Sequence, residues 1–221
     1  MLISNDNKEV RYLYKKANMV FIIIILIIGL SGCNKNSEIP SDDELVFAIP
    51  EEFQGIMQNK KVYITSIGQS IDIENFMINI VHLAEEEKYD FTYIYDTELE
   101  ASEVESSAIV FLIVGCSIKA MSDAGITIDS ERTRAEEFVA LRESGKITLI
   151  SWHLGGMSRR GTTSDGLIEI AFAASDINIF VKSGNSDGFL AKISLDHDVS
   201  MYQIATISSV TEPLMLLLVS E

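Results

Sequence analysis

Residues 108–114 read AIVFLIV, and this run of seven apolar residues limits the possible folds more than any other feature of the sequence. A strand with one face in water alternates apolar and polar residues, whereas a strand buried on both faces is apolar throughout. Ser107 and Gly115 bound the run, which is too short for an ordinary helix. The run therefore predicts a strand of a parallel sheet that helices cover on both faces.

The rest of the chain alternates between strand-like and helix-like segments. We expect strands at residues 61–66, 89–95, 108–114, 147–152, 177–181 and 203–207, and a short edge strand at 45–49. We expect helices at residues 71–87, 129–144, 167–174, 189–195 and 213–219. Regular alternation of this kind predicts an α/β fold: a single three-layer, doubly wound domain with a mostly parallel sheet of about five to six strands.

The N-terminal part of the sequence differs in character from the rest. A basic region precedes an apolar run at residues 19–30, which has the length of a signal-peptide core and is too short to span a membrane. The run ends in Leu30-Ser31-Gly32-Cys33, which resembles the lipobox of bacterial lipoproteins. This resemblance implies cleavage before Cys33 and lipidation of that residue. An uncleaved anchor with an incidental cysteine is the alternative.

These features predict three regions. Residues 1–32 form a lipoprotein signal peptide, residues 33–44 form the lipidated cysteine and a flexible tether, and residues 45–221 form the α/β domain. The lipid would place the protein in the cell membrane as a lipid-anchored protein on the extracytoplasmic face, with the bilayer as its partner through Cys33. Cys116 is then the one remaining cysteine, so an internal disulfide is excluded.

The chain is strongly acidic, with a formal net charge of −16. Residues 1–32 contain four cationic and two acidic side chains, so the remainder carries about −18. Nucleic-acid binding depends on lysine and arginine that displace counterions from phosphates, and this charge argues against it. Charge would also repel anionic lipid head groups, which leaves the lipid chain to hold the protein at the membrane.

Polar, glycine-rich and cationic residues follow four of the predicted strands. In an open parallel sheet these loops meet at one edge, where ligands bind. Within such an acidic chain, cations collected there would attract a carboxylate or a phosphate. We therefore expect a small anionic or polar ligand to be bound by Ser66, Gly68, Gln69, Ser70, Ser117, Lys119, His153, Gly155, Gly156, Arg159, Arg160, Lys182 and Asn185.

Several of these residues have a second interpretation. Adjacent Arg159 and Arg160 cannot easily both point inward, so one is expected to contact the ligand and the other a surface acid, unless both are solvated. Gly155 and Gly156 let a backbone approach a ligand or form a tight turn. Ser70 binds ligand or caps a helix. Nucleotide motifs are absent from the sequence, and the three histidines are scattered, so we expect no cofactor and no metal.

The sequence leaves more than one function possible, and three hypotheses remain. The first hypothesis is a surface lipoprotein that binds a small ligand, with a solute receptor of an uptake system as one version and a transporter or surface protein as partner. The second is an extracytoplasmic hydrolase that uses Ser70 or Cys116 with His153 as base, although no residue is assigned as catalytic. The third is a protein-interaction module without catalytic activity.

Three segments also carry a family resemblance. They read TS-x-GQS at residues 65–70, H-x-GG-x-x-RRG-x-x-SD at residues 153–165, and K-x-GN-x-DGF at residues 182–189. Together they resemble an uncharacterised family of exported bacterial α/β proteins that is classed only as a domain of unknown function. The resemblance covers residue 61 to the C-terminus. It implies that the three loops belong together, but it transfers no catalytic residue.

Overall fold

The computed structural model describes residues 45–86 and 89–219, so the predicted signal peptide, Cys33 and tether lie outside the described part. The strands are β1 (Lys60–Ile67), β2 (Phe91–Tyr95), β3 (Ile109–Val114), β4 (Thr148–His153), β5 (Ile177–Val181) and β6 (Ser200–Ile204). The helices are α2 (Ile73–Glu85), α3 (Ile118–Ala124), α4 (Ile128–Glu143), α5 (Thr162–Phe172), α6 (Phe189–Asp196) and α7 (Thr211–Leu218). Short 3-10 turns include η2 (Ala101–Glu103), η3 (Met157–Arg159) and η4 (Lys182–Gly184).

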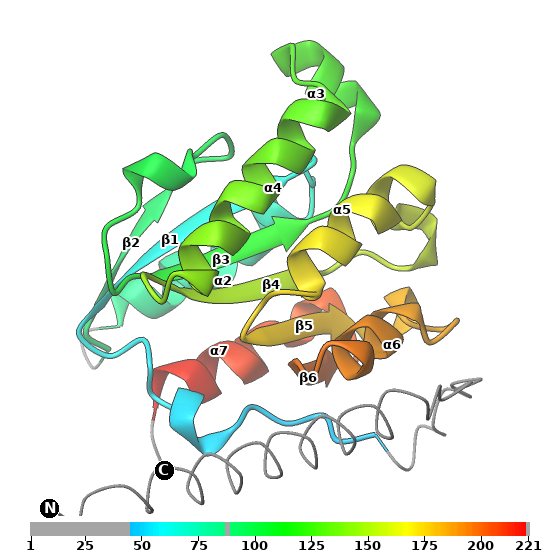
Figure 1. The fold of residues 1–221 in the computed structure, drawn as a ribbon. Coiled ribbons are helices and arrows are strands. Elements are labelled where there is room, and N and C mark those ends of the chain that lie inside the picture. Colours follow the sequence, from blue (N-terminus) through cyan, green and yellow to red (C-terminus); the bar gives the residue numbers. More distant parts are fainter. Residues whose placement is uncertain (1–44, 87–88, 220–221) are drawn as a thin grey trace, which may run out of the picture. The chain divides into compact units, whose positions relative to one another are not determined.

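The six strands form one sheet in the order β2-β1-β3-β4-β5-β6, and every pair is parallel (Figure 1). The predicted α/β fold with a parallel sheet is thus confirmed. After β1 the chain adds β2 on one side and then returns to place β3 on the other. The strand order therefore reverses between β1 and β3, and ligands of open α/β sheets bind at such a reversal.

Helices cover both faces of the sheet, which explains why β3 has no polar residue. Alternate β3 residues Ile109, Phe111 and Ile113 pack into a core shared with α2 and α7. Val110, Leu112 and Val114 pack into a second core shared with α4, α5 and α6. Figure 1 shows α4, α5 and α6 in front of the sheet, and α2 and α7 behind it. The three-layer prediction is correct.

Aromatic rings fill the first of these cores. Trp152 on β4 lies edge-to-face against Phe76 and Phe111, with ring centroids 4.8 and 5.4 Å apart. Such contacts add about 0.5–1.5 kcal/mol each beyond the burial of area. Trp152 has no exposed surface, so its side chain belongs to the core and is not available for stacking on a ligand.

The structure differs from the sequence prediction at four elements. One of them is α5, which begins at Thr162, five residues before its predicted start. Residues 118–124 form α3 where a loop was expected, because Ser117 accepts a hydrogen bond from the N–H of Ala120 and starts a helix that buries only Met121. The segment at 45–49 is not a strand. The last strand begins at Ser200, three residues before the prediction, and Met201 and Ile204 are its buried residues.

Candidate functional site

The four loops that follow β1, β3, β4 and β5 meet at the carboxyl edge of the sheet. Their backbones touch one another in two places. The N–H of Ser117 donates to the carbonyl of Gly68 at 2.8 Å. A Cβ atom on Gly184 would lie 2.5 Å from the carbonyl oxygen of Gly155, so the β4–α5 and β5–α6 loops are also in contact.

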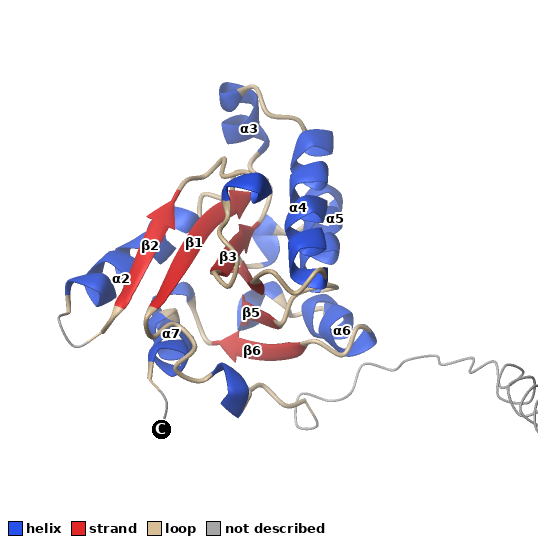
Figure 2. Ribbon diagram, turned by 60° about the vertical axis from the view of Figure 1, so that its left-hand side comes forward, coloured by secondary structure: helices blue, strands red, loops and turns tan. Residues whose placement is uncertain are grey.

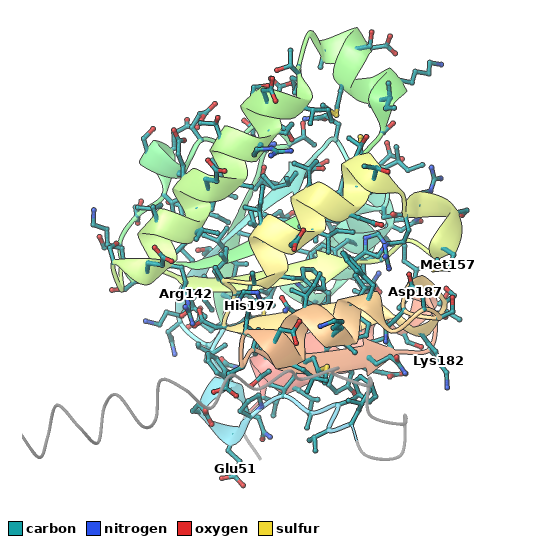
Figure 3. All side chains as sticks on the ribbon, turned by 45° about the vertical axis from the view of Figure 1, so that its right-hand side comes forward. Glu51, Arg142, Met157, Lys182, Asp187 and His197 are labelled. Atoms are coloured by element: carbon teal, nitrogen blue, oxygen red, sulfur yellow. The ribbon has the colours of Figure 1, made fainter. Side chains whose placement is uncertain are left out.

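Figure 3 shows this edge from the side. The labelled residues Met157, Lys182 and Asp187 lie together at one end of the domain, and Arg142 and His197 lie at the other. In Figure 1 the arrowheads of β3 and β5 point toward the end where α5 and α6 begin. The β4–α5 and β5–α6 loops, which the sequence singled out, are therefore neighbours.

The polar groups of the β1–α2 loop are bonded within the protein. The hydroxyl of Ser66 is fully buried and accepts a hydrogen bond from the N–H of Ser70 at 2.6 Å. The hydroxyl of Ser70 donates to Asp72 at 3.4 Å, and the amide of Gln69 donates to the carbonyl of Thr97 at 3.3 Å. Because α2 begins after Asp72, Ser70 is not its N-cap residue. These side chains stabilise the loop.

A buried ion pair that the sequence did not reveal supports the same loop. Glu131 and Arg134 on α4 are 2 % and 5 % exposed, and their side chains are 2.8 Å apart. Glu131 accepts a hydrogen bond from the N–H of Gly68. Arg134 donates to the hydroxyl of Thr65 at 3.1 Å and to the carbonyls of Ser66 and Leu99. The pair therefore ties α4 to the end of β1, next to the point where the strand order reverses.

The β3–α3 loop contains the free cysteine. The Sγ atom of Cys116 lies 3.7 Å from Sδ of Met121, and its N–H donates to the hydroxyl of Ser164 at 3.0 Å. Burial raises the pKa of the Cys116 thiol, and the carboxylate of Glu131 raises it further. A raised pKa leaves little thiolate at neutral pH, so this thiol is a weak nucleophile. Lys119 is exposed on α3.

His153 ends β4 and is completely buried. Its Nδ1 atom lies 2.9 Å from the carbonyl oxygen of Val114, while Nε2 is buried without a hydrogen-bond partner. Burial lowers the pKa of His153; the Val114 bond opposes this shift and the charge of Arg160 adds to it. The ring is therefore neutral at pH 7, and neither Ser70 nor Cys116 is hydrogen-bonded to it.

Arg160 has all of its donor groups occupied by the protein. Its side chain is only 3 % exposed and forms a two-point ion pair with Asp165. It also donates to the carbonyl of Gly184 at 2.7 Å, contacts Asp187 at 3.3 Å, and lies 4.3 Å from the ring centre of Phe189. Arg160 therefore joins the β4–α5 loop, α5 and the β5–α6 loop, and it is the arginine that pairs with acids.

The ion pair with Arg160 affects the pKa of the Asp165 carboxyl. Partial burial favours the neutral carboxyl, but the hydrogen bonds from Arg160 and from the N–H of Gly161 favour the carboxylate more strongly. Together they hold the pKa of Asp165 below its ordinary value. Asp165 lies inside the first turn of α5, and the N-cap position belongs to Gly161, which makes no side-chain cap bond.

Arg159 is the exposed member of the arginine pair, and it forms no ion pair with any residue in the described part of the chain. A Cβ on Gly155 would lie 2.4 Å from Cβ of Arg159, so glycine is required for Arg159 to pack over this loop. A hollow of about 240 Å³ lies here, at the start of α5. It is lined by Cys116, Ile118, Ser158, Arg159, Arg160, Gly161, Thr162, Thr163 and Ser164.

The other predicted residues do not line this hollow. Asn185 is buried, and its Oδ1 atom accepts a hydrogen bond from the N–H of Ala191, so it stabilises the start of α6. Lys182 is exposed in η4, and Gly156 packs near the hydroxyl of Ser183. Of the thirteen predicted ligand-binding residues, Arg159 and Arg160 therefore line the 240 Å³ hollow. The hydroxyls of Ser158, Thr162 and Thr163 were not predicted, although the run Gly161-Thr162-Thr163-Ser164 at a helix start was a usable signal.

The sequence matches a family described as "Domain of unknown function (DUF6305)" over residues 59–218. The chain belongs to this family. The match extends from just before β1 to the end of α7, so it covers the whole sheet and all of the rim loops of this DUF6305 protein. The expected membership in an uncharacterised domain family is confirmed, while the individual motifs and the lipoprotein signal remain predictions.

Other comparisons add little to the description of the DUF6305 domain. No curated protein matches it. The solved structure of the YdjI aldolase from Escherichia coli K12 is similar at 12% sequence identity, covering 76% of this chain and 86% of the aldolase chain. The TM-score of that comparison is 0.20, which is too low to support an argument about fold or activity.

Two further properties concern the described residues of the DUF6305 protein. No helix within residues 45–86 and 89–219 combines the length and apolar character needed to cross a membrane. In the same part of the chain, no group of three or more His, Cys, Asp or Glu side chains is arranged to hold a metal ion.

Proposed function

We propose that this DUF6305 protein is a membrane-anchored extracytoplasmic lipoprotein whose α/β domain binds a small anion at the start of α5. The lipobox-like sequence at Cys33 supports the anchor. The main support for binding is the guanidinium of Arg159, which forms no ion pair within the described residues. It lies beside a hollow that is also lined by the first turn of α5.

The chemistry of this hollow suits an anion. The first N–H groups of a helix have no intrahelical acceptor and lie at the positive end of the helix dipole. α5 has 11 residues, and its N-cap Gly161 supplies no side chain to satisfy these groups. Arg159 adds a full positive charge, and Ser158, Thr162 and Thr163 add hydroxyl donors. Asp165 does not cancel the charge of Arg159, because its carboxylate is paired with Arg160.

The volume of the hollow limits the ligand. At about 240 Å³ it is smaller than the roughly 300–1,000 Å³ of sites for drug-sized ligands. Inorganic phosphate or a short-chain carboxylate fits this size. A larger hollow of about 510 Å³ is unsuited to anions. It is lined by Glu98, Glu100 and Glu137, and the arginine in its lining, Arg134, is already paired with Glu131.

The hydrolase hypothesis receives less support than binding. A nucleophilic serine or cysteine needs a base within hydrogen-bond reach. The expected base, His153, is hydrogen-bonded to neither nucleophile, and its Nδ1 atom is engaged with the carbonyl of Val114. The Ser70 hydroxyl donates to Asp72, and the Cys116 thiol contacts Met121. The raised pKa of the Cys116 thiol also disfavours nucleophilic attack.

Binding can be tested by thermal unfolding of the full-length protein with phosphate, acetate, succinate or citrate added. A ligand at 100 times its Kd should add about 2.7 kcal/mol of stability and raise the melting temperature. Replacing Arg159 with alanine should weaken binding about 10- to 100-fold, because a hydrogen bond to a charged group contributes about 1.5–3 kcal/mol. Lys119→Ala removes another exposed positive charge, one that does not line the hollow, and should leave binding unchanged. The absence of stabilisation by every anion would contradict the proposal.

The anchor has its own test in the producing cells. Cys33→Ser should move the protein from the membrane fraction to the soluble fraction, because each buried methylene of a lipid chain contributes about 0.8 kcal/mol to membrane binding. Cys116→Ser is the matched control, since Cys116 is the other cysteine of the chain, and it should leave the protein in the membrane fraction. Retention of the Cys33→Ser protein in the membrane would favour an uncleaved anchor instead.

A further inference from the structure

β2 is the outermost strand on one side of the sheet, and its outer edge is open. It pairs with β1 and with no other described strand. Figure 2 shows β2 at the side of the sheet with α2 next to it. An open edge presents unpaired N–H and C=O groups to solvent, and proteins usually protect it with lysine, proline or a bulge. β2 has the sequence FTYIY, which contains neither a charge nor a proline.

The surface beside this edge is apolar. On the face of the sheet that α2 covers, Tyr95 of β2 is 41% exposed and Val81 of α2 is 38% exposed. Ile94, which is 38% exposed, points to the opposite face. The hydrogen bond from Thr211 of α7 to Asn79 shows which side of α2 faces α7. With 3.6 residues per turn, Val81 lies on the side of α2 turned away from Asn79, toward β2. Ile78 is 68% exposed and lies opposite the buried Phe76 and Ile80, so it points away from the sheet.

Acidic side chains lie at both ends of this apolar surface. α2 leads into β2 and runs opposite to it, so Glu74 lies near the end of β2 and Glu85 near its beginning. Burial raises the pKa of the Tyr95 hydroxyl, and the nearby charges of Glu74 and Asp96 raise it further, consistent with this placement. Asp90 and Asp96 flank β2 directly, and all four acids are exposed.

We propose that the open edge of β2 binds an extended segment of another protein as a seventh strand, with apolar residues in the middle of the segment and Lys or Arg at both ends. The main chain of the segment would pair with β2, as in other cases of strand addition. Its apolar side chains would cover Tyr95 and Val81. Its cations would meet Glu74 and Asp96 at one end and Glu85 and Asp90 at the other.

Charge favours such a segment over a second copy of this chain. In a two-fold antiparallel pairing of two β2 strands, Asp90 of one copy would face Asp96 of the other, and like charges directly opposite one another destabilise a sheet. The chain also carries a net charge of −16, so two copies repel each other, whereas a basic segment is attracted.

The test measures binding of a labelled, end-blocked peptide, Lys-Lys-Thr-Val-Thr-Val-Thr-Lys-Lys, to the full-length protein by fluorescence anisotropy. Saturable binding is expected that weakens with added salt and falls at least tenfold when the central threonine is replaced by proline. Val81→Lys should weaken binding at least tenfold. Ile118→Lys changes an isoleucine that is 71% exposed on α3 and should have no effect.

Three results would overturn the proposal. The first is no binding of the peptide, and the second is equal binding of the proline-containing peptide, which would indicate charge attraction without strand pairing. The third is a dimer of the protein that Val81→Lys dissociates, which would assign the β2 edge to a second copy. None of these results depends on anion binding at α5, because the two sites share no residue.

Discussion

Replacing Arg134 with methionine is expected to lower the free energy of unfolding by about 3–5 kcal/mol, the usual cost of removing one partner of a buried ion pair. The carboxylate of Glu131, which is 2 % exposed, would lose its counter-charge. The hydroxyl of Thr65 and the carbonyls of Ser66 and Leu99 would lose a donor. Urea denaturation followed by circular dichroism measures the change.

Two variants control for other causes. Arg132→Met changes an exposed arginine on the same helix and should alter stability by less than about 0.5 kcal/mol. The double variant Glu131→Gln with Arg134→Met removes the buried charge and keeps an acceptor for the N–H of Gly68, so it should recover part of the loss. A loss below about 1 kcal/mol in Arg134→Met would mean that the pair is hydrated and not buried.

Replacing Gly68 with alanine should destabilise the domain by roughly 2–5 kcal/mol. Gly68 has φ of +80°, and a Cβ there would lie 2.3 Å from the carbonyl oxygen of Gly115. The left-handed conformation costs an ordinary residue about 1–2 kcal/mol, and overpacking adds about 1–3 kcal/mol. The backbone of β3 cannot move away easily, because the N–H of Gly115 also donates to the carbonyl of Ile67.

Gly125→Ala separates these two contributions. Gly125 has φ of +73°, but nothing lies within 4 Å of the position that its Cβ would occupy. The alanine variant should therefore show the conformational cost alone, about 1–2 kcal/mol. Equal losses in the two variants would show that the contact between the β1–α2 and β3–α3 loops is not close in solution.

The sheet was predictable because the apolar composition of each strand by itself indicates a strand buried on both faces. Buried parallel strands such as residues 109–114 have no polar positions, and alternation with helices then determines an α/β fold. α3 could not be predicted in the same way. It has seven residues and one buried side chain, Met121, so it leaves no apolar period in the sequence.

The meeting of the four loops at one edge of the sheet was predictable, but the direction of their side chains was not. Topology alone brings the loops after parallel strands to one edge. The two arginines, however, are distinguished by Asp187 in a different loop and by Asp165 one turn further on, which together bind Arg160 and leave Arg159 exposed. Glu131 and Arg134 lie on a helix of mostly exposed polar residues, where a buried ion pair has no distinguishing pattern.

The all-parallel sheet also has a consequence for how the protein is made. In such a sheet no strand pairs with a neighbour through a tight hairpin. β1 begins at Lys60, and its partners in the sheet are β2, which ends at Tyr95, and β3, which ends at Val114. Non-local pairing of this kind makes folding slow. A chain that is exported, as we propose, must cross the membrane before it folds, and slow strand pairing keeps it in a form that can still be threaded through a translocation channel.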